Sequence, residues 1–127
     1  MRKTTTISEL LGKTLYTCEG KVGDKEIRFK TTEGVEYVLY HEQDCCEDVE
    51  IVDICGELSD LVDSPIIQAE ESSNSEELPP GVEPPFIDDT FTWTFYRLAT
   101  AKGQVVIRWY GSSNGYYSES VDFARIE

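Results

Sequence analysis

Strict alternation in the last third of the chain constrains the fold more than any other feature. In residues 91–96, Phe91, Trp93 and Phe95 alternate with two threonines and a tyrosine, and residues 105–110 form a second apolar stretch. Residues two apart share one face of a β-strand, so both segments predict strands. The Gly-Ser-Ser-Asn-Gly run at 111–115 predicts a turn. We therefore expect residues 116–123 to close a hairpin on the preceding strand.

Shorter segments of the same kind occur nearer the N-terminus, separated by glycine-containing turns. Two apolar pieces, residues 8–12 and 57–62, predict short helices, the first ended by Gly12. Strands are expected at residues 14–19, 26–30, 35–40, 49–54 and 66–69. Together these elements predict an α+β fold dominated by an antiparallel sheet, curled or shaped as a half-barrel, with one or two short helices.

The chain has 127 residues, which fits one domain spanning residues 1–127. Residues 70–89 hold four of its five prolines together with several acids, and we expect a mobile excursion there. No apolar run approaches the roughly 20 residues that span a bilayer, and no apolar signal core follows Met1. A cytoplasmic protein is therefore expected. Its four cysteines are then expected to be reduced: Cys18, Cys45, Cys46 and Cys55.

Charge is distributed unevenly along the sequence. Residues 31–96 contain eighteen acids and no lysine or arginine, whereas the two ends together contain seven acids and eleven bases. The middle therefore carries −18 and the ends +4, giving the formal net charge of −14. Such a middle segment repels nucleic acid and anionic membranes, so neither is an expected partner. A basic protein surface would be attracted instead, although the charge also serves solubility.

Four blocks of sequence carry a resemblance to a known family. They are Tyr40–Glu47, Asp53–Leu58, Trp93–Tyr96 and Ile107–Ser118. With them, the stretch from about residue 10 to residue 126 resembles a family of small bacteriophage proteins built on a domain of unknown function. The resemblance implies a phage accessory protein made inside a host bacterium. It supplies no activity, which must be argued from the residues.

Several groups of residues could carry metal or acid–base chemistry, but each has a simpler interpretation. His41 with Cys45, Cys46 and Cys55 lacks the Cys-x₂₋₄-Cys spacing of zinc sites. Acids near the paired cysteines would raise a thiol pKa and oppose a nucleophilic role. The acids Asp44, Glu47, Asp48, Asp53 and Asp60 lack an EF-hand pattern and predict a solvated acidic face. We expect no metal, no cofactor and no catalytic residue.

The stretch from Arg108 to Ser118 is the richest in binding groups. Its arginine can pair with phosphate, its aromatic rings can stack on bases, and amides near glycine can hold anions. No Walker or dinucleotide fingerprint is present. A tyrosine-rich hairpin that merely covers the sheet is the alternative. The predicted ligand-binding residues are Arg108, Trp109, Tyr110, Ser112, Asn114, Tyr116, Tyr117, Ser118 and His41.

Three functions follow from these observations. The first is a binding protein that sequesters a small nucleotide-like signalling molecule without catalysis and so counters host defence. In this function Arg108 would neutralise the phosphate of the ligand. A homo-oligomer would help so small a protein to enclose its ligand. The second is an acidic decoy, in which residues 42–89 mimic nucleic acid and bind a host protein. The third, a hydrolase, ranks last because no acid–base pair is convincing.

Overall fold

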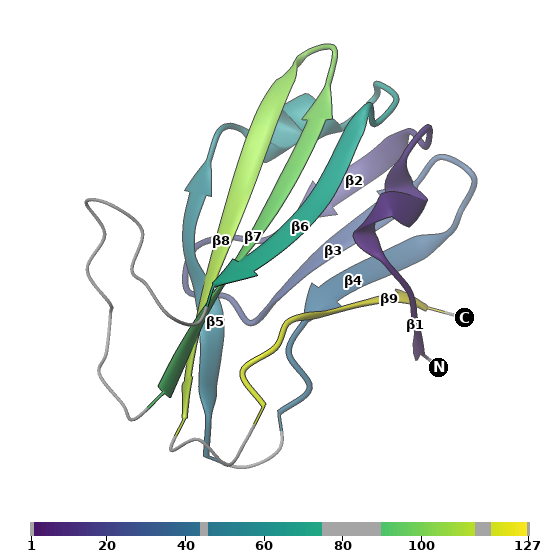
Figure 1. Cartoon of the computed structure of the whole chain (residues 1–127). Helices are drawn as coiled ribbons and strands as arrows, with labels where there is room; N and C mark the ends of the chain where they lie inside the picture. The colour runs from purple at the N-terminus through teal and green to yellow at the C-terminus, as the bar shows by residue number, and fades with distance from the viewer. Residues whose placement is uncertain (1, 44–45, 75–89, 114–117, 127) are drawn as a thin grey trace.

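Two antiparallel β-sheets pack face to face around a shared core (Figure 1). The computed structural model of the chain describes residues 2–43, 46–74, 90–113 and 118–126. Within these residues, a five-stranded sheet has the order β1 (Arg2–Thr4), β9 (Asp122–Ile126), β4 (Glu36–Tyr40), β3 (Glu26–Thr31) and β2 (Leu15–Glu19). A four-stranded sheet has the order β5 (Asp48–Cys55), β8 (Gly103–Ser113), β7 (Thr90–Thr100) and β6 (Gln68–Asn74).

The helices of the described residues are two 3-10 turns, η1 (Ile7–Leu10) and η2 (Leu58–Leu61). Both lie where the sequence predicts a short helix, and Gly12 follows η1 with a φ of +82°. Neither turn is long enough to form a helical layer. The prediction of a mainly antiparallel sheet is confirmed, but the described residues form two β layers without a closed barrel, and an α+β description fits them only loosely. No helix of the described residues is long and apolar enough to cross a membrane.

The longest hairpin of the protein joins β7 to β8, with pairing from Thr90↔Ser113 to Thr100↔Gly103. The predicted hairpin between 105–110 and 116–123 is therefore wrong. Residues 111–113 belong to β8, whereas residues 114–117 lie outside the described residues. The last strand, β9, pairs with β4 and β1 in the other sheet. Turn composition indicated a reversal of the chain, but it could not show that the next strand changes sheets.

Strand β6 extends further than its sequence predicts. Residues 70–74 were expected to begin a mobile excursion, yet they pair in register with residues 93–97 of β7. Their polar composition hides the alternation, because only Ala69 of this strand belongs to the hydrophobic core. The remainder of the expected excursion, residues 75–89, lies outside the described residues.

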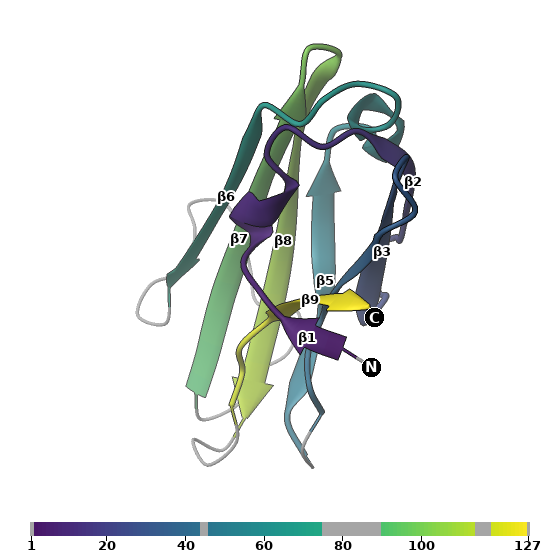
Figure 2. The same ribbon diagram turned by 90° about the vertical axis from the view of Figure 1, so that its right-hand side faces the viewer.

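Alternating side chains of both sheets build the core. On β8, Val105, Ile107 and Trp109 point inwards and are buried, which leaves Arg108 on the outer face. They meet the inner face of the five-stranded sheet, where Tyr37 stacks on Phe123 with ring centroids 5.3 Å apart. Figure 2 shows the two layers from the side, with η1 beside β6 along one open margin. Because burial of apolar surface contributes roughly 25 cal/mol per Å², this shared core is the main source of stability.

The chain passes from one sheet to the other after β4 and again after β8, and both passages lie near the same end of the molecule (Figure 1). Residues from the two passages touch there, because the ring of His41, just after β4, contacts the carbonyl of Ser120, just before β9. Nearby, the β2–β3 turn is bonded to β5: Gly23 donates to the Ile51 carbonyl at 2.8 Å, and Ile51 donates to the Asp24 carbonyl at 3.1 Å. This end of the molecule holds the candidate site.

Candidate functional site

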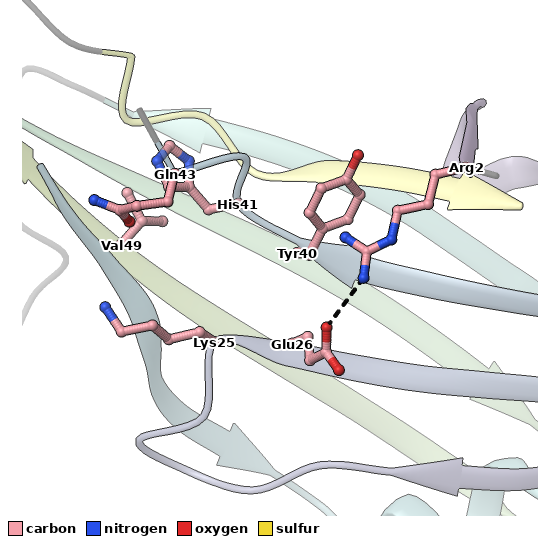
Figure 3. A pocket seen from close by; sticks show the side chains of 7 residues that line it. All are labelled: Arg2, Lys25, Glu26, Tyr40, His41, Gln43 and Val49. Carbon is pink, nitrogen blue, oxygen red and sulfur yellow. Dashed lines mark hydrogen bonds and ion pairs between the residues drawn. The ribbon is translucent and has the colours of Figure 1, made fainter. Parts of the chain in front are cut away.

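A cleft of about 470 Å³ opens where the chain leaves β4 (Figure 3). Its walls come from β1, the β2–β3 turn, β3, β4, the start of β5 and the residues between β4 and β5. We call this hollow the cleft, and it is lined by Arg2, Lys25, Glu26, Tyr40, His41, Gln43 and Val49. Its volume falls within the range of roughly 300–1,000 Å³ that is usual for small-molecule sites.

One end of the cleft is formed by Arg2, Tyr40 and Glu26. The guanidinium of Arg2 lies 4.3 Å from the centre of the Tyr40 ring, a cation–π contact. It also pairs with Glu26 at 3.5 Å, as Figure 3 shows, and the two side chains are 37% and 42% exposed. Arg2 is thus held over the ring mainly by stacking, with a long and solvated ion pair beside it.

Lys25 stands towards the other end of the cleft, on the side of Gln43 and Val49 (Figure 3). Its ammonium lies 3.9 Å from a carboxylate oxygen of Asp48, and these side chains are 59% and 67% exposed. Exposed ion pairs of this kind contribute roughly 0–1 kcal/mol. The ion pairs of Arg2 and Lys25 are long and exposed. An anion that binds either cation more tightly could therefore displace its carboxylate at little cost in free energy.

Beside Gln43 and Val49, the imidazole of His41 is held at both of its nitrogens (Figure 3). Nδ1 lies 2.6 Å from the carbonyl oxygen of Ser120, and Nε2 lies 2.8 Å from Oε2 of Glu47. The His41 side chain is 4% exposed and that of Glu47 is fully buried. The amide of Gln43 donates to the Glu47 carbonyl at 2.7 Å and to its Oε1 at 3.1 Å. His41 therefore offers a rigid wall to the cleft.

A second hollow, of about 340 Å³, shares His41 and Gln43 with the cleft. We call it the serine hollow, and it is lined by His41, Glu42, Gln43, Ser118, Ser120 and Asp122. The hydroxyls of Ser118 and Ser120 are 2.8 Å apart and hydrogen-bonded to each other. Two of the predicted ligand-binding residues, His41 and Ser118, therefore border one hollow.

The other predicted residues of β8 are placed differently. Arg108 lies on the outer face of the four-stranded sheet, where its Nε donates to Oδ2 of Asp53 at 3.1 Å. Hydrogen bonds, first from Arg108 and then from the Cys55 thiol, lower the pKa of Asp53. The structure thus shows Arg108 paired with a carboxylate of the acidic middle segment, residues 31–96.

Its neighbours on β8 are buried. Trp109 lies in the core, and Tyr110 packs edge-on against Trp93 with centroids 4.7 Å apart. Ser112 is 1% exposed. None of these three side chains presents a free surface to a ligand from solvent. Asn114, Tyr116 and Tyr117 lie outside the described residues, so their predicted role remains a prediction.

Comparison with known proteins places the sequence in a family. Residues 8–123 match the family described as Domain of unknown function (DUF7448). The chain belongs to this DUF7448 family. No curated protein and no solved structure gives a significant match to the chain. All the residues that line the cleft fall within the DUF7448 match except Arg2, which precedes it.

The cysteines of this DUF7448 domain do not share one state. Cys46 is disulfide-bonded, so the prediction of a reduced thiol is wrong at this position. Cys18 and Cys55 are free. Burial raises the pKa of Cys18 to about 12, and a hydrogen bond to Asp53 raises that of Cys55. Neither free thiol is therefore poised as a thiolate nucleophile.

Metal chemistry finds little support in the arrangement of the described residues. No three of their histidine, cysteine, aspartate and glutamate side chains are grouped closely enough to hold a metal ion. Both nitrogens of His41 are already bonded, and Cys55 lies at the far end of β5, where its thiol donates to Asp53. Asp44 and Cys45, also considered from the sequence, lie outside the described residues.

Sequence reasoning missed the residues that form the ends of the cleft. Arg2, Lys25 and Tyr40 are spread over nearly forty residues and come together only through strand pairing, with β1 reaching its place through β9. A local signal did exist, since all eleven bases lie outside the acidic middle of the sequence. It indicated which segments could receive an anion, but not which of their bases would share a hollow.

Proposed function

We propose that this protein binds and sequesters a small, anionic, nucleotide-like molecule in the cleft, without catalysing its conversion. One observation carries the proposal: two basic side chains and an aromatic ring line a hollow of ligand size on a protein of formal net charge −14. Arg2 lies against Tyr40 at one end, and Lys25 stands towards the other. A cation at each end suits a ligand with two separated anionic groups.

The ligand would bind by replacing carboxylates. A phosphate can accept two parallel N–H bonds from a guanidinium, whereas Arg2 now has one contact of 3.5 Å with Glu26. Lys25 would act as a point charge on a second phosphate. Because the net charge of the protein repels anions at long range, a ligand with few charges is favoured over a highly charged polyphosphate.

The surroundings of the cleft support binding more than turnover. A general base needs a nitrogen or carboxylate free to take a proton from the substrate. His41 has both nitrogens engaged by protein atoms, and the free thiols of the described residues, Cys18 and Cys55, have raised pKa values. The resemblance to phage proteins suggests a context in which binding alone suffices: a phage accessory protein, assembled as a homo-oligomer in the host cytoplasm, that removes a defence signal.

The proposal can be tested by calorimetric titration with three probes: inorganic phosphate, AMP and a cyclic dinucleotide. We expect the cyclic dinucleotide to bind most tightly, because it carries two separated phosphates. Lys25→Gln and Arg2→Gln should each weaken binding tenfold or more, since a hydrogen bond to a charged group contributes roughly 1.5–3 kcal/mol. Lys21→Gln, from the same turn, and Lys3→Gln, from the same strand, are matched controls.

Two results would contradict the proposal. One is the absence of binding by all three probes at millimolar concentration. The other is an equal effect of the cleft variants and their controls, which would show that only overall charge matters.

A second candidate, the acidic decoy, is favoured by the exposure of the acids of the middle segment. Glu57, Asp63 and Glu70 are all exposed, whereas Glu47 is the buried exception among the described acids of this segment. Replacing these three exposed acids by their amides should abolish capture of a basic host protein if a polyanionic surface recognises it. The same replacements should leave binding of the cyclic dinucleotide unchanged if the cleft is the site.

A further inference from the structure

His41 is the single histidine of the chain, and it joins three segments that are far apart in sequence. It follows the last residue of β4, its Nδ1 contacts the carbonyl of Ser120 two residues before β9, and its Nε2 contacts Glu47 just before β5. Both passages between the sheets are therefore tied together through one imidazole ring. The same ring forms part of the wall of both hollows.

The partners of the ring determine how many protons it needs. A carbonyl oxygen can only accept, so Nδ1 must carry a proton to bond Ser120. If Nε2 carried no proton, its lone pair would face an oxygen of the Glu47 carboxylate at 2.8 Å, and the two groups would repel each other. A second proton must therefore lie between Nε2 and Oε2. Imidazole is a stronger base than a carboxylate, so the shared proton makes His41 an imidazolium and leaves Glu47 a carboxylate, whose Oε1 accepts the Gln43 amide.

We infer that His41 and Glu47 form a proton-dependent clasp that holds the two passages between the sheets together. With the shared proton in place, every polar atom described for the pair has a complementary partner in a buried site. When the proton is lost at high pH, the contact with Glu47 becomes repulsive and the clasp opens. The stabilisation is therefore present where imidazolium is available and is lost as the pH rises.

Charged groups on all sides of the clasp act on the shared proton. Acids of the cleft and of the serine hollow favour its retention, because they stabilise a cation, whereas the two cations of the cleft favour its loss. The acids are Glu26, Glu42 and Asp122, with Asp48 beside Lys25, and the cations are Arg2 and Lys25. Acids outnumber cations around the ring.

Glu47→Gln provides a sharp test because it keeps the shape of the side chain. The new amide can donate to Nε2 of a neutral His41, whose Nδ1 still donates to Ser120, while the amide oxygen accepts from Gln43. The variant should therefore fold with the same contacts but without need of the second proton. Glu42→Gln is the matched control, since Glu42 borders the serine hollow without a described bond to the ring.

The readouts are nitrogen NMR of the single imidazole and the melting temperature from pH 6 to pH 9.5, both without ligand. In the wild type and in Glu42→Gln, we expect protons on both ring nitrogens at pH 7 and a melting temperature that falls as the pH rises. In Glu47→Gln, we expect a proton on Nδ1 alone and a smaller fall. A wild-type ring with one proton at pH 7, or equal pH profiles for all three proteins, would overturn the inference.

The wild-type spectrum decides the question even if Glu47→Gln fails to fold. Because neither measurement involves a ligand, failure of the clasp leaves the proposed function of the cleft to be judged by its own titrations.

Discussion

Removing the imidazole of His41 should destabilise the protein strongly at neutral pH. His41→Ala leaves the Glu47 carboxylate, which is fully buried, without its cationic partner and leaves the Ser120 carbonyl without a donor. Breaking a buried pair by removing one member costs about 3–5 kcal/mol, because a charge is left uncompensated. For a chain of 127 residues, each kcal/mol corresponds to about 4 °C in Tm, so we expect a loss of roughly 12–20 °C.

Urea unfolding at several pH values is the appropriate assay. The deficit of His41→Ala should shrink as the pH is lowered, because protonation of Glu47 neutralises the stranded charge. Adding Glu47→Ala should recover part of the lost stability at pH 7, since the double variant has no buried charge to leave unpaired. A loss below about 1 kcal/mol at pH 7, or a double variant less stable than His41→Ala, would refute the reasoning.

Three further predictions concern the outer face of β8, the core and the thiols. Arg108→Ala should cost about 1 kcal/mol or less of stability and leave ligand binding unchanged, because Arg108 pairs with Asp53 at a partly exposed site. Since that pair lowers the pKa of Asp53, its contribution should be present at neutral pH and be lost as the pH falls through that lowered value. Acid titration of Asp53→Asn should therefore show a shallower loss. Trp109→Ala should cost about 3–5 kcal/mol by urea unfolding, as for other buried aromatic residues. Alkylation at pH 8 should be slow at Cys55 and slower at Cys18, and a rate at Cys18 equal to that of a free thiol would contradict its burial.

The strands were predictable wherever one face is apolar. Residues 26–30 alternate polar and apolar side chains, and residues 35–40 and 49–54 are mainly apolar. Each segment lies within an observed strand or overlaps all but its first residue. The alternation also placed Arg108 and Trp109 on opposite faces of β8, and the burial of Trp109 confirms it. The strand predicted at residues 66–69 overlaps only the start of β6, and the rest of β6 was not predicted because its inward positions after Ala69 are polar. Local pattern thus reports which face of a strand is buried, but only when apolar side chains occupy that face.

The pairing of the sheets was not predictable in the same way. The Gly-Ser-Ser-Asn-Gly run at residues 111–115 is compatible in sequence with a hairpin and equally with a passage to another sheet. The choice depends on where Val121 and Phe123 find an apolar partner, and Phe123 finds Tyr37 of the five-stranded sheet. Such contacts join residues more than eighty positions apart. Their energy is realised only in the assembled core, so no window of sequence contains it.

Dependence on the assembled fold also explains why the sequence pointed to Arg108 as the candidate site, whereas the structure points to the cleft. An arginine between aromatic residues looks like a ligand anchor in sequence, yet Asp53 of the neighbouring strand already satisfies it. Arg2 and Lys25 look like ordinary surface bases, yet strand pairing leaves them with long, exposed ion pairs at the border of a hollow. A base is available to a ligand when its own protein partners are weak. That property belongs to the fold, and it favours the cleft over the outer face of β8 as the place where an anion binds.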